Sequence, residues 1–255
     1  MAQSGRLEGS IAIVTAGGQG IGEAIAKTFA REGASVAVVD MNRTEAERVA
    51  REIKVADGHA LALETDVTRT DAVTAMVQTV LARWTTVDIL VNAAGGFHRL
   101  APITDITDDE WDHVITVNLK STFLCSRAVA PTMIERKKGR IINIASGSGI
   151  APNPYASTYL PYGAAKAGVI NFSKVLGRDL GQYGITVNAI SPGTTATPRV
   201  VKVRDAESMR RIAEQNPMRC LVQVEDTAEA ALYLASPEAR YVTGVNLNVN
   251  AGNLM

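Results

Sequence analysis

Net charge, paired cysteines and long apolar runs are all missing from this chain of 255 residues. Its 26 basic side chains are matched by 26 acidic ones, so no overall basic field is available to hold nucleic acid or an anionic membrane surface. No apolar run approaches the roughly 18 residues that span a bilayer. We therefore expect neither nucleic acid nor a membrane as a partner.

Patterns typical of metal sites and of secretion are missing too. Cys125 and Cys220 form no CxxC pair, and the three histidines show neither HxxH nor HExxH spacing. The first ten residues contain neither the basic segment nor the apolar segment of a secretory signal. The sequence predicts a cytoplasmic protein with reduced thiols and no metal.

What the chain does contain is an alternation of short β-branched runs with amphipathic segments of helical length. Runs such as IAIV and IINI are apolar on both faces, so the sheet they form needs helices on both sides, which right-handed βαβ crossovers supply. The expected strands are 11–15, 35–39, 60–64, 89–93, 140–145, 186–190 and 245–249, and the expected helices are 23–32, 44–55, 71–84, 108–135, 157–180 and 227–235. No linker or repeat interrupts the pattern. We expect one domain over residues 1–255, a doubly wound α/β fold whose seven-stranded parallel sheet is flanked by helices on both faces.

Some of these helices carry signals at their ends. Asp71 and Asp108 stand where an N-cap carboxylate meets the first free amides of a helix. A basic run at residues 136–138, followed by Gly139, favours the end of the long helix. The least regular stretches, 147–161 and 191–216, follow strand ends, where open α/β sheets bind ligands.

A glycine-rich turn, TAGGQGIG at residues 15–22, joins the first expected strand to the first expected helix. Small residues let backbone amides approach a pyrophosphate, and the helix N-terminus adds partial positive charge. Asp40 ends the second strand 18 residues after Gly22, where its carboxylate can accept hydrogen bonds from the ribose hydroxyls of adenosine. A tight turn without a ligand is the alternative for the glycines alone. Together with Asp40, they favour a dinucleotide site.

Tyr162 and Lys166 lie four residues apart in an expected helix, so their side chains share one face. An ammonium about 4 Å from a phenol, at an effective dielectric near 20, is worth about 4 kcal/mol, or roughly three pKa units. We therefore expect Lys166 to bring the pKa of Tyr162 from about 10 to near 7, within reach of proton transfer at neutral pH. A surface pair is the default for this spacing. Ser146, placed to bond a reacting oxygen, and Asn118, a poor helix former inside a long helix, favour catalysis instead.

At this point the chain resembles the short-chain dehydrogenase/reductase family over nearly its whole length. The matching motifs are the glycine turn, Asp66-Val67, the NAAG of residues 92–95, Asn118, Ser146, Tyr162 to Lys166, and Pro192-Gly193. The resemblance implies a seven-stranded Rossmann-type sheet, nicotinamide-linked hydride transfer and a tetrad of Asn118, Ser146, Tyr162 and Lys166. The cofactor contacts that it implies, beside Tyr162 and Lys166, are Gly17, Gln19, Gly20, Ile21 and Asp40 in the first βαβ unit, Asp66 and Val67 at the adenine, Asn92 and Gly95 along the cofactor, and Pro192, Gly193 and Thr197 at the nicotinamide.

Two alanines and one spacing depart from the family pattern. Ala16 stands where the first turn glycine is usual and Ala93 where a second asparagine is usual; each methyl is a small change if the local φ is negative. The interval from Ser146 to Tyr162 is about three residues longer than is common. Ser148 is therefore a rival for the serine, although the NIAS of residues 143–146 fits the family register better. Tyr155 and Tyr159 are rivals for the tyrosine, but neither has a lysine four residues later.

The leading interpretation is an oxidoreductase that interconverts a secondary alcohol and a ketone with NAD(H). Ser146 and Tyr162 hold the carbonyl oxygen, and Lys166 binds the nicotinamide ribose, lowers the phenol pKa and passes protons through a water held by Asn118. An NADPH-dependent 3-oxoacyl thioester reductase is the alternative; Asp40 would repel a 2′-phosphate, but Arg43 is close enough to keep that alternative open. A non-catalytic dinucleotide sensor or scaffold is the alternative of another class.

The substrate and the assembly are less defined. Residues 96–99, 150–159 and 194–216 are expected to surround the pocket, where Phe97, Tyr155 and Tyr159 suit a cyclic or aromatic ligand or pack the loops. Arg99 either meets a substrate carboxylate or stays solvated. The resemblance implies a homotetramer formed by the long fourth and fifth helices and the C-terminal strand. Because Leu254 and Met255 are apolar, we expect a neighbouring subunit to cover them; the alternative is that they fold back onto their own subunit.

Overall fold

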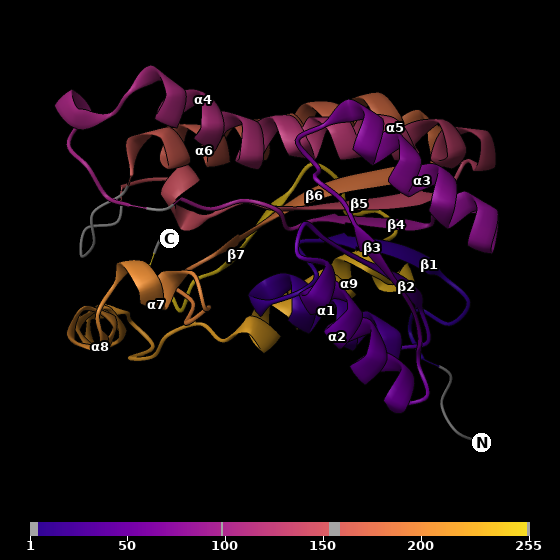
Figure 1. Ribbon diagram of the computed structural model, residues 1–255, viewed down its shortest axis with the longest axis horizontal. Coiled ribbons are helices and arrows are strands. Elements are labelled where there is room, and N and C mark those ends of the chain that lie inside the picture. The colour runs from indigo at the N-terminus through magenta and orange to yellow at the C-terminus, as the bar shows by residue number, and fades with distance from the viewer. Residues whose placement is uncertain (1–4, 98, 153–158, 254–255) are drawn as a thin grey trace.

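The computed structural model describes residues 5–97, 99–152 and 159–253, and a sheet of seven parallel strands runs through its centre (Figure 1). The strands are β1 (Ile11–Thr15), β2 (Ser35–Asp40), β3 (His59–Glu64), β4 (Ile89–Asn92), β5 (Gly139–Ile144), β6 (Ile185–Pro192) and β7 (Asn246–Val249). Their order in space is β3-β2-β1-β4-β5-β6-β7. The predicted doubly wound sheet is confirmed, and each strand lies within two residues of its expected bounds.

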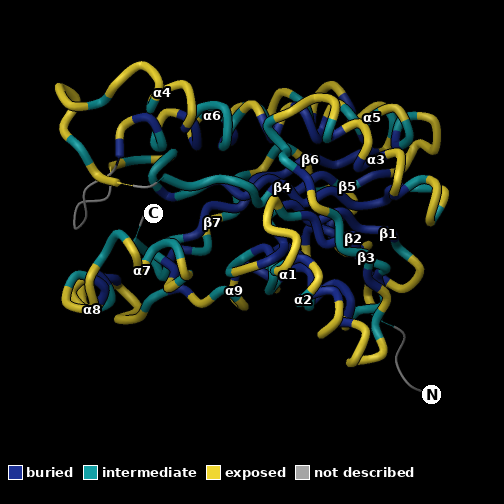
Figure 2. Tube along the Cα trace, in the orientation of Figure 1, coloured by how far each residue is buried: buried dark blue, intermediate teal, exposed yellow. Residues whose placement is uncertain are grey.

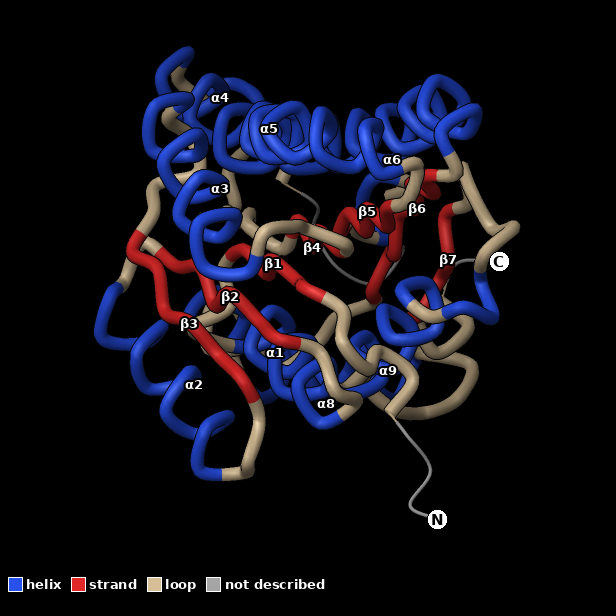
Figure 3. Tube along the Cα trace, turned by 90° about the vertical axis from the view of Figure 1, so that its right-hand side faces the viewer, coloured by secondary structure: helices blue, strands red, loops and turns tan. Residues whose placement is uncertain are grey.

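Helices cover both faces of the sheet because the central strands are apolar on both faces (Figures 2 and 3). On one face lie α1 (Gly20–Arg31), α2 (Arg43–Val55) and α9 (Val224–Ala235), and on the other lie α3 (Thr70–Trp84), α5 (Ser121–Arg136) and α6 (Leu160–Leu180). Each layer buries its own apolar cluster against the strands. Among the described residues, no helix has the length and apolarity needed to cross a bilayer.

The long fourth crossover helix is interrupted in the middle. Where one helix over 108–135 is expected, α4 (Asp108–Ile115) passes into a π-helical turn at Thr116–Lys120 before α5 begins. Asn118 lies in this turn and is fully buried. Single π turns inside α-helices are common at functional sites, because they shift the side chains and carbonyls of one turn out of the regular pattern.

Two helices in the stretch 191–216 are missing from the sequence-based expectation. They are α7 (Val200–Val203) and α8 (Ala206–Gln215). Only Met209 and Ile212 of α8 are buried, so its apolar pattern is too sparse to stand out among charged residues. The start of α6 expected at residue 157 lies outside the described residues. Short 3-10 turns occupy Ile103–Asp105, Gly147–Gly149, Gly181–Tyr183 and Pro237–Ala239.

Two helices begin at other N-cap residues than expected. Thr107 caps α4 through a reciprocal pair of hydrogen bonds with Glu110, so Asp108 lies in the first turn instead. Asp71 also lies in the first turn of its helix, one residue after the first helical position. Both carboxylates still oppose the positive end of a helix dipole. The expected basic C-terminus is confirmed, since α5 ends at Arg136.

The condition of a negative φ, under which a methyl at position 16 is a small change, is not met at Ala16. Its φ is +50°, in the left-handed region where a Cβ is strained, whereas Ala93 is absent from the residues of positive φ. The departure from glycine is therefore a small change at Ala93 but a strained one at Ala16.

We expect Ala16→Gly to stabilise the fold by about 0.5–1 kcal/mol. Relief of the left-handed strain outweighs the entropy that a glycine adds to the unfolded chain. Urea unfolding measures the free energy, with Ala93→Gly as the matched control, because that residue is also half-buried at a strand end but lacks the strain. The free energy of unfolding of the Ala93→Gly control should fall by about 0.5–1 kcal/mol, because glycine adds conformational entropy to the unfolded chain. Equal losses in both variants would contradict the prediction.

Candidate active site

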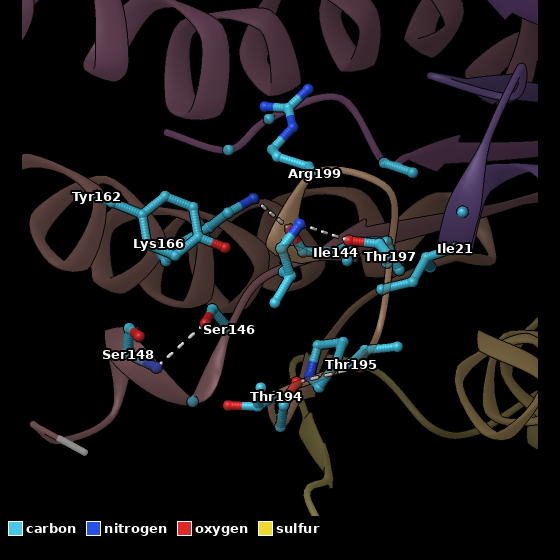
Figure 4. Close-up of a pocket in the computed structure, with 18 of the residues that line it drawn as sticks. Ile21, Ile144, Ser146, Ser148, Tyr162, Lys166, Thr194, Thr195, Thr197 and Arg199 are labelled. Atoms are coloured by element: carbon cyan, nitrogen blue, oxygen red, sulfur yellow. Dashed lines mark hydrogen bonds between the residues drawn. The ribbon is translucent and has the colours of Figure 1, made fainter. Parts of the chain in front are cut away.

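A cavity opens where β1, β4, β5 and β6 end, next to the switch in strand order between β1 and β4 (Figure 4). Open parallel sheets bind ligands at this place. Ten of the residues predicted for catalysis or cofactor binding line it: Gln19, Gly20, Ile21, Gly95, Ser146, Tyr162, Lys166, Pro192, Gly193 and Thr197. The structure thus brings together residues that are up to 178 positions apart in the sequence.

Helix α6 carries Tyr162 and Lys166 on the face that meets the end of β5. Lys166 is only 3% exposed, and its Nζ donates a hydrogen bond of 2.7 Å to the carbonyl oxygen of Ile144. The same Nζ lies 5.7 Å from the centroid of the Tyr162 ring. Ser146 follows Ile144 by two residues, so a single strand end positions both the lysine and the serine.

Burial controls the ionisation of this pair. Desolvation, with a smaller contribution from the nearby positive charge of Arg199, lowers the pKa of Lys166 to about 7. Desolvation also raises the pKa of Tyr162, while a hydrogen bond with Ser146 and the charge of Arg199 oppose that rise. The expectation that Lys166 brings the phenol near 7 is wrong for this geometry, because the cost of burying a phenolate exceeds the stabilisation that nearby groups give it.

The rivals for the serine and the tyrosine are placed differently. Ser146 shares the hydrogen bond with Tyr162, and its Oγ also accepts one from the backbone amide of Ser148. Ser148 lines the cavity as a neighbour of this pair. Tyr159 is 2% exposed and packs its ring 5.9 Å from that of Phe97, outside the cavity lining. Tyr155 lies outside the described residues.

Asn118 is buried behind the cavity and holds the loop that follows β4. Its Oδ1 accepts a hydrogen bond of 2.7 Å from the Gly96 amide, and its Nδ2 donates one of 2.9 Å to the Gly96 carbonyl. A Cβ on Gly95 would overlap Asn118 Oδ1 and come within 3.0 Å of Lys166 Nζ. Glycine at position 95 therefore lets the loop pass close to both members of the predicted tetrad.

The N-terminus of α1 faces the cavity without a side-chain cap. Gln19 occupies the N-cap position but makes no capping hydrogen bond, and Gln19, Gly20 and Ile21 all line the cavity. The first amides of a helix have no partner within the helix and attract anions. This end of the cavity therefore fits the pyrophosphate of a dinucleotide.

Gly17 and Asp40 support the turn rather than line the cavity. The Gly17 amide donates to the carbonyl of Val39, and the Gly18 amide donates to Asp40 Oδ2 at 3.0 Å. The other carboxylate oxygen of Asp40 accepts from the Asn42 amide at 2.9 Å. Because each oxygen retains a further lone pair, the carboxylate keeps acceptor capacity for ribose hydroxyls.

Three other predicted cofactor residues lie outside the cavity lining. Asn92 is 3% exposed, and its amide donates to Asn143 at 2.8 Å and to Ser126 at 3.2 Å. Its side chain is thus held in the core, and its expected place along the cofactor stays a prediction. Asp66 accepts hydrogen bonds from the amide and the hydroxyl of Thr68, and Val67 packs against the apolar cluster on the α3 face.

Arg199 and Arg204, which flank α7, line the cavity; they lie in the range 194–216 expected around the pocket, but neither was singled out there. Asn250 and Asn253 also line the cavity and were not expected. The only signal available was their position in or after the irregular stretch at residues 191–216. Arg99, the sequence candidate for a substrate carboxylate, instead forms an ion pair of 2.6 Å with Glu110.

Comparisons with known proteins agree with this geometry. A family model described as Enoyl-(Acyl carrier protein) reductase matches residues 15–253. The 3-oxoacyl-[acyl-carrier-protein] reductase FabG of Staphylococcus aureus is 37% identical over 96% of this chain and 98% of its own length.

Two solved structures are similar over nearly their whole length. A putative short-chain dehydrogenase/reductase from Burkholderia xenovorans is 35% identical, with a TM-score of 0.91 over 98% of both chains. A 7α-hydroxysteroid dehydrogenase complexed with NADH and 7-oxo glycochenodeoxycholic acid is 36% identical, with a TM-score of 0.92 over 97% of this chain and 95% of that one. The order of motifs, the sheet and these matches together show that the chain belongs to the short-chain dehydrogenase/reductase family of oxidoreductases.

Proposed function

We propose that this chain, acting as a single domain, interconverts a secondary alcohol and a ketone with NAD(H). The observation that carries the proposal is the half-buried Tyr162, one helical turn from Lys166, in a cavity that Ser146 also lines and that the uncapped N-terminus of α1 faces. A nicotinamide dinucleotide, when bound, supplies or accepts the hydride.

Tyr162 acts as the proton donor and acceptor. Because burial raises its pKa, the phenol keeps its proton at neutral pH and can give it to a carbonyl oxygen as that oxygen gains negative charge. Ser146 holds the same oxygen by a hydrogen bond. In the reverse direction Tyr162 must first lose its proton, so we expect alcohol oxidation to need a higher pH than ketone reduction.

Lys166 supports this proton transfer. Its pKa of about 7 lets the amine exchange a proton at neutral pH, which a solvated lysine does poorly. Its ammonium form also holds the nicotinamide ribose. The backbone carbonyl oxygen of Asn118 accepts a hydrogen bond of 3.0 Å from the Thr122 hydroxyl. Its second lone pair can hold the water that links Lys166 to solvent.

The preference for NAD(H) follows from the charges around Asp40. Arg43, the basic residue that kept NADP(H) open, forms an ion pair of 2.7 Å with Glu47. Arg48, whose Nη2 donates to the Gly18 carbonyl, is paired with Glu23, Glu45 and Glu52. Carboxylates therefore compensate both cations that lie near the turn, which leaves Asp40 to repel a 2′-phosphate.

A 3-oxoacyl thioester is the second candidate substrate, favoured by the similarity to 3-oxoacyl-[acyl-carrier-protein] reductases, to which the chain is 36–37% identical. The same tyrosine and serine would serve that reaction. Reduction of a 3-oxoacyl thioester and of small ketones, measured with NADH and NADPH, separates the two candidates. A protein that turns over neither class would instead support the non-catalytic sensor.

We also propose a homotetramer, as the family resemblance implies. Strand β7 lies at an edge of the sheet, and exposed edges need cover. On the α4, α5 and α6 side, Trp111, Phe123, Leu160 and Val175 are large apolar residues with 38–52% exposure. Leu254 and Met255, expected to pack on a neighbouring subunit, lie outside the described residues.

Replacing Tyr162 by phenylalanine should lower turnover by at least about 100-fold, because the ring remains while the proton donor is lost. Binding of NADH, followed by its fluorescence, should stay within about twofold of the original. Tyr159→Phe is the matched control, since that buried tyrosine lies outside the cavity lining, and it should keep its activity. Half the original activity in the Tyr162 variant would refute the assignment.

The cofactor preference should depend on the charge of Asp40. We expect kcat/KM to favour NAD(H) over NADP(H) by at least about tenfold, or 1.4 kcal/mol, and Asp40→Asn to remove most of that difference. Asp71→Asn, an exposed change in α3, should leave the ratio unaltered. Comparable efficiency of the unaltered protein with both cofactors would exclude the proposed preference.

The buried Lys166 should destabilise the fold in a pH-dependent way. Below pH 7 Lys166 is charged in both the folded and the unfolded chain, so the full cost of burying its charge lowers the free energy of unfolding. Between pH 7 and about 10 the folded chain has released this proton while the unfolded chain still holds it. The free energy of unfolding therefore rises with pH in this range. Lys166→Met should therefore raise the free energy of unfolding by about 1–3 kcal/mol at pH 6, with a smaller gain at pH 9. The exposed Lys202→Met serves as control. A gain independent of pH would contradict the shifted pKa.

Light scattering at micromolar concentration tests the assembly. A tetramer should scatter with about four times the 27.1 kDa of one chain. A mass near 27 kDa would exclude the proposal, and about twice that mass would leave only a dimer.

A further inference from the structure

The cavity is basic although the chain as a whole is neutral. Its lining includes Lys166, Arg199 and Arg204 and, among the described residues, no aspartate or glutamate. The whole chain has 26 basic and 26 acidic side chains. A cleft lined by charges of one sign focuses the electrostatic potential and attracts ligands of the opposite sign.

Arg199 brings this charge to the catalytic end of the cavity. It follows β6 by seven residues and reaches the loop after β4, where a Cβ on Gly96 would overlap its Nη1. Gly96 is the residue held by Asn118, and the charge of Arg199 acts on both Tyr162 and Lys166. Figure 4 shows Arg199, Tyr162, Lys166 and Ser146 around the same cavity, although they come from three separate segments.

The guanidinium of Arg199 has no carboxylate partner among the described residues. Arg43, Arg48 and Arg99, in contrast, are each paired with at least one glutamate. A half-buried arginine that lines a cavity and meets no aspartate or glutamate in the described part of the chain retains its capacity to bind a carboxylate through two parallel hydrogen bonds.

The pyrophosphate of the cofactor has a different place in the cavity. It fits the N-terminus of α1, where a Cβ on Gly20 would come 3.3 Å from the methyl carbon of Thr197. Arg199 instead contacts the Gly96 loop, whose next residue, Phe97, packs its ring 5.0 Å from that of Tyr162. The arginine therefore lies with the groups that meet the reacting carbonyl.

We propose that the substrate of this site is an oxo acid or the corresponding hydroxy acid, and that Arg199 binds its carboxylate while Tyr162 and Ser146 hold the oxygen that reacts. This substrate class rests on the proposed function. In the reductive direction one oxo acid, one NADH and one proton give one hydroxy acid and one NAD⁺.

Matched pairs of acid and ester test the proposal. Acetoacetate, levulinate and 5-oxohexanoate differ in the distance from carboxylate to ketone, and each methyl ester removes the charge while adding one methyl group. With NADH, kcat/KM for the best acid should exceed that for its ester by about 10- to 100-fold. Arg199→Met should remove this advantage, mainly through KM, and Arg199→Lys should restore part of it. Lys202→Met, which changes an exposed cation three residues away, should retain the full preference.

Binding without turnover provides the second measurement. An oxo acid and NAD⁺ cannot react with each other, so calorimetry of the acid with the enzyme–NAD⁺ complex reports affinity alone. Arg199→Met should lower the affinity for the oxo acid by at least about tenfold and leave the affinity for NADH within about threefold of the original. A loss of NADH affinity instead would assign the arginine to the cofactor and overturn the proposal.

The remaining outcomes separate this proposal from the proposed function. Equal use of acids and esters, unaffected by Arg199→Met, would overturn the oxo-acid substrate and leave the alcohol and ketone chemistry standing. Binding that depends on Arg199, without turnover of any ketone, would support the anion site and count against the reaction. Failure of every acid to bind the enzyme–NAD⁺ complex would overturn the oxo-acid substrate.

Discussion

The hydrogen bond from Lys166 to the carbonyl of Ile144 joins helix α6 to the end of β5, and the geometry of the site depends on it. A lysine that is 3% exposed needs a partner for its amine, and the last carbonyl of the strand provides one. This contact fixes the position of α6 relative to the end of β5. Ser146, two residues after Ile144, and Tyr162, one turn before Lys166, thereby line the same cavity.

A second set of buried hydrogen bonds keeps the surrounding elements in register. Asn92 at the end of β4 donates to Asn143 of β5, which donates at 2.9 Å to Ser173 of α6. On the other side of the cavity, Asn118 holds both backbone groups of Gly96. Each buried amide is satisfied by a partner from a different element, so a shift of any one element would leave a buried polar group unpaired.

Electrostatics divide the cavity into two ends with different tasks. At the end formed by α1, backbone amides face the cavity, and the nearby arginines are neutralised by glutamates. At the catalytic end, side-chain cations gather and burial lowers the pKa of Lys166 to about 7. The first arrangement suits a pyrophosphate whose ribose meets a carboxylate, and the second suits an anionic substrate.

The sequence by itself determined the seven strands, most of the helices and the pairing of Tyr162 with Lys166, because these depend on periodicity and local spacing. Only the tertiary structure decided the features that depend on distant contacts. Asn92 donates its side-chain hydrogen bonds to partners in the core, and burial raises the pKa of Tyr162 more than nearby groups lower it. Arg99 forms an ion pair with Glu110, whereas Arg199 lines the cavity. The left-handed backbone at Ala16 belongs to the same group. Local pattern specifies which element a residue joins, whereas desolvation and partner choice depend on what the folded chain places around it.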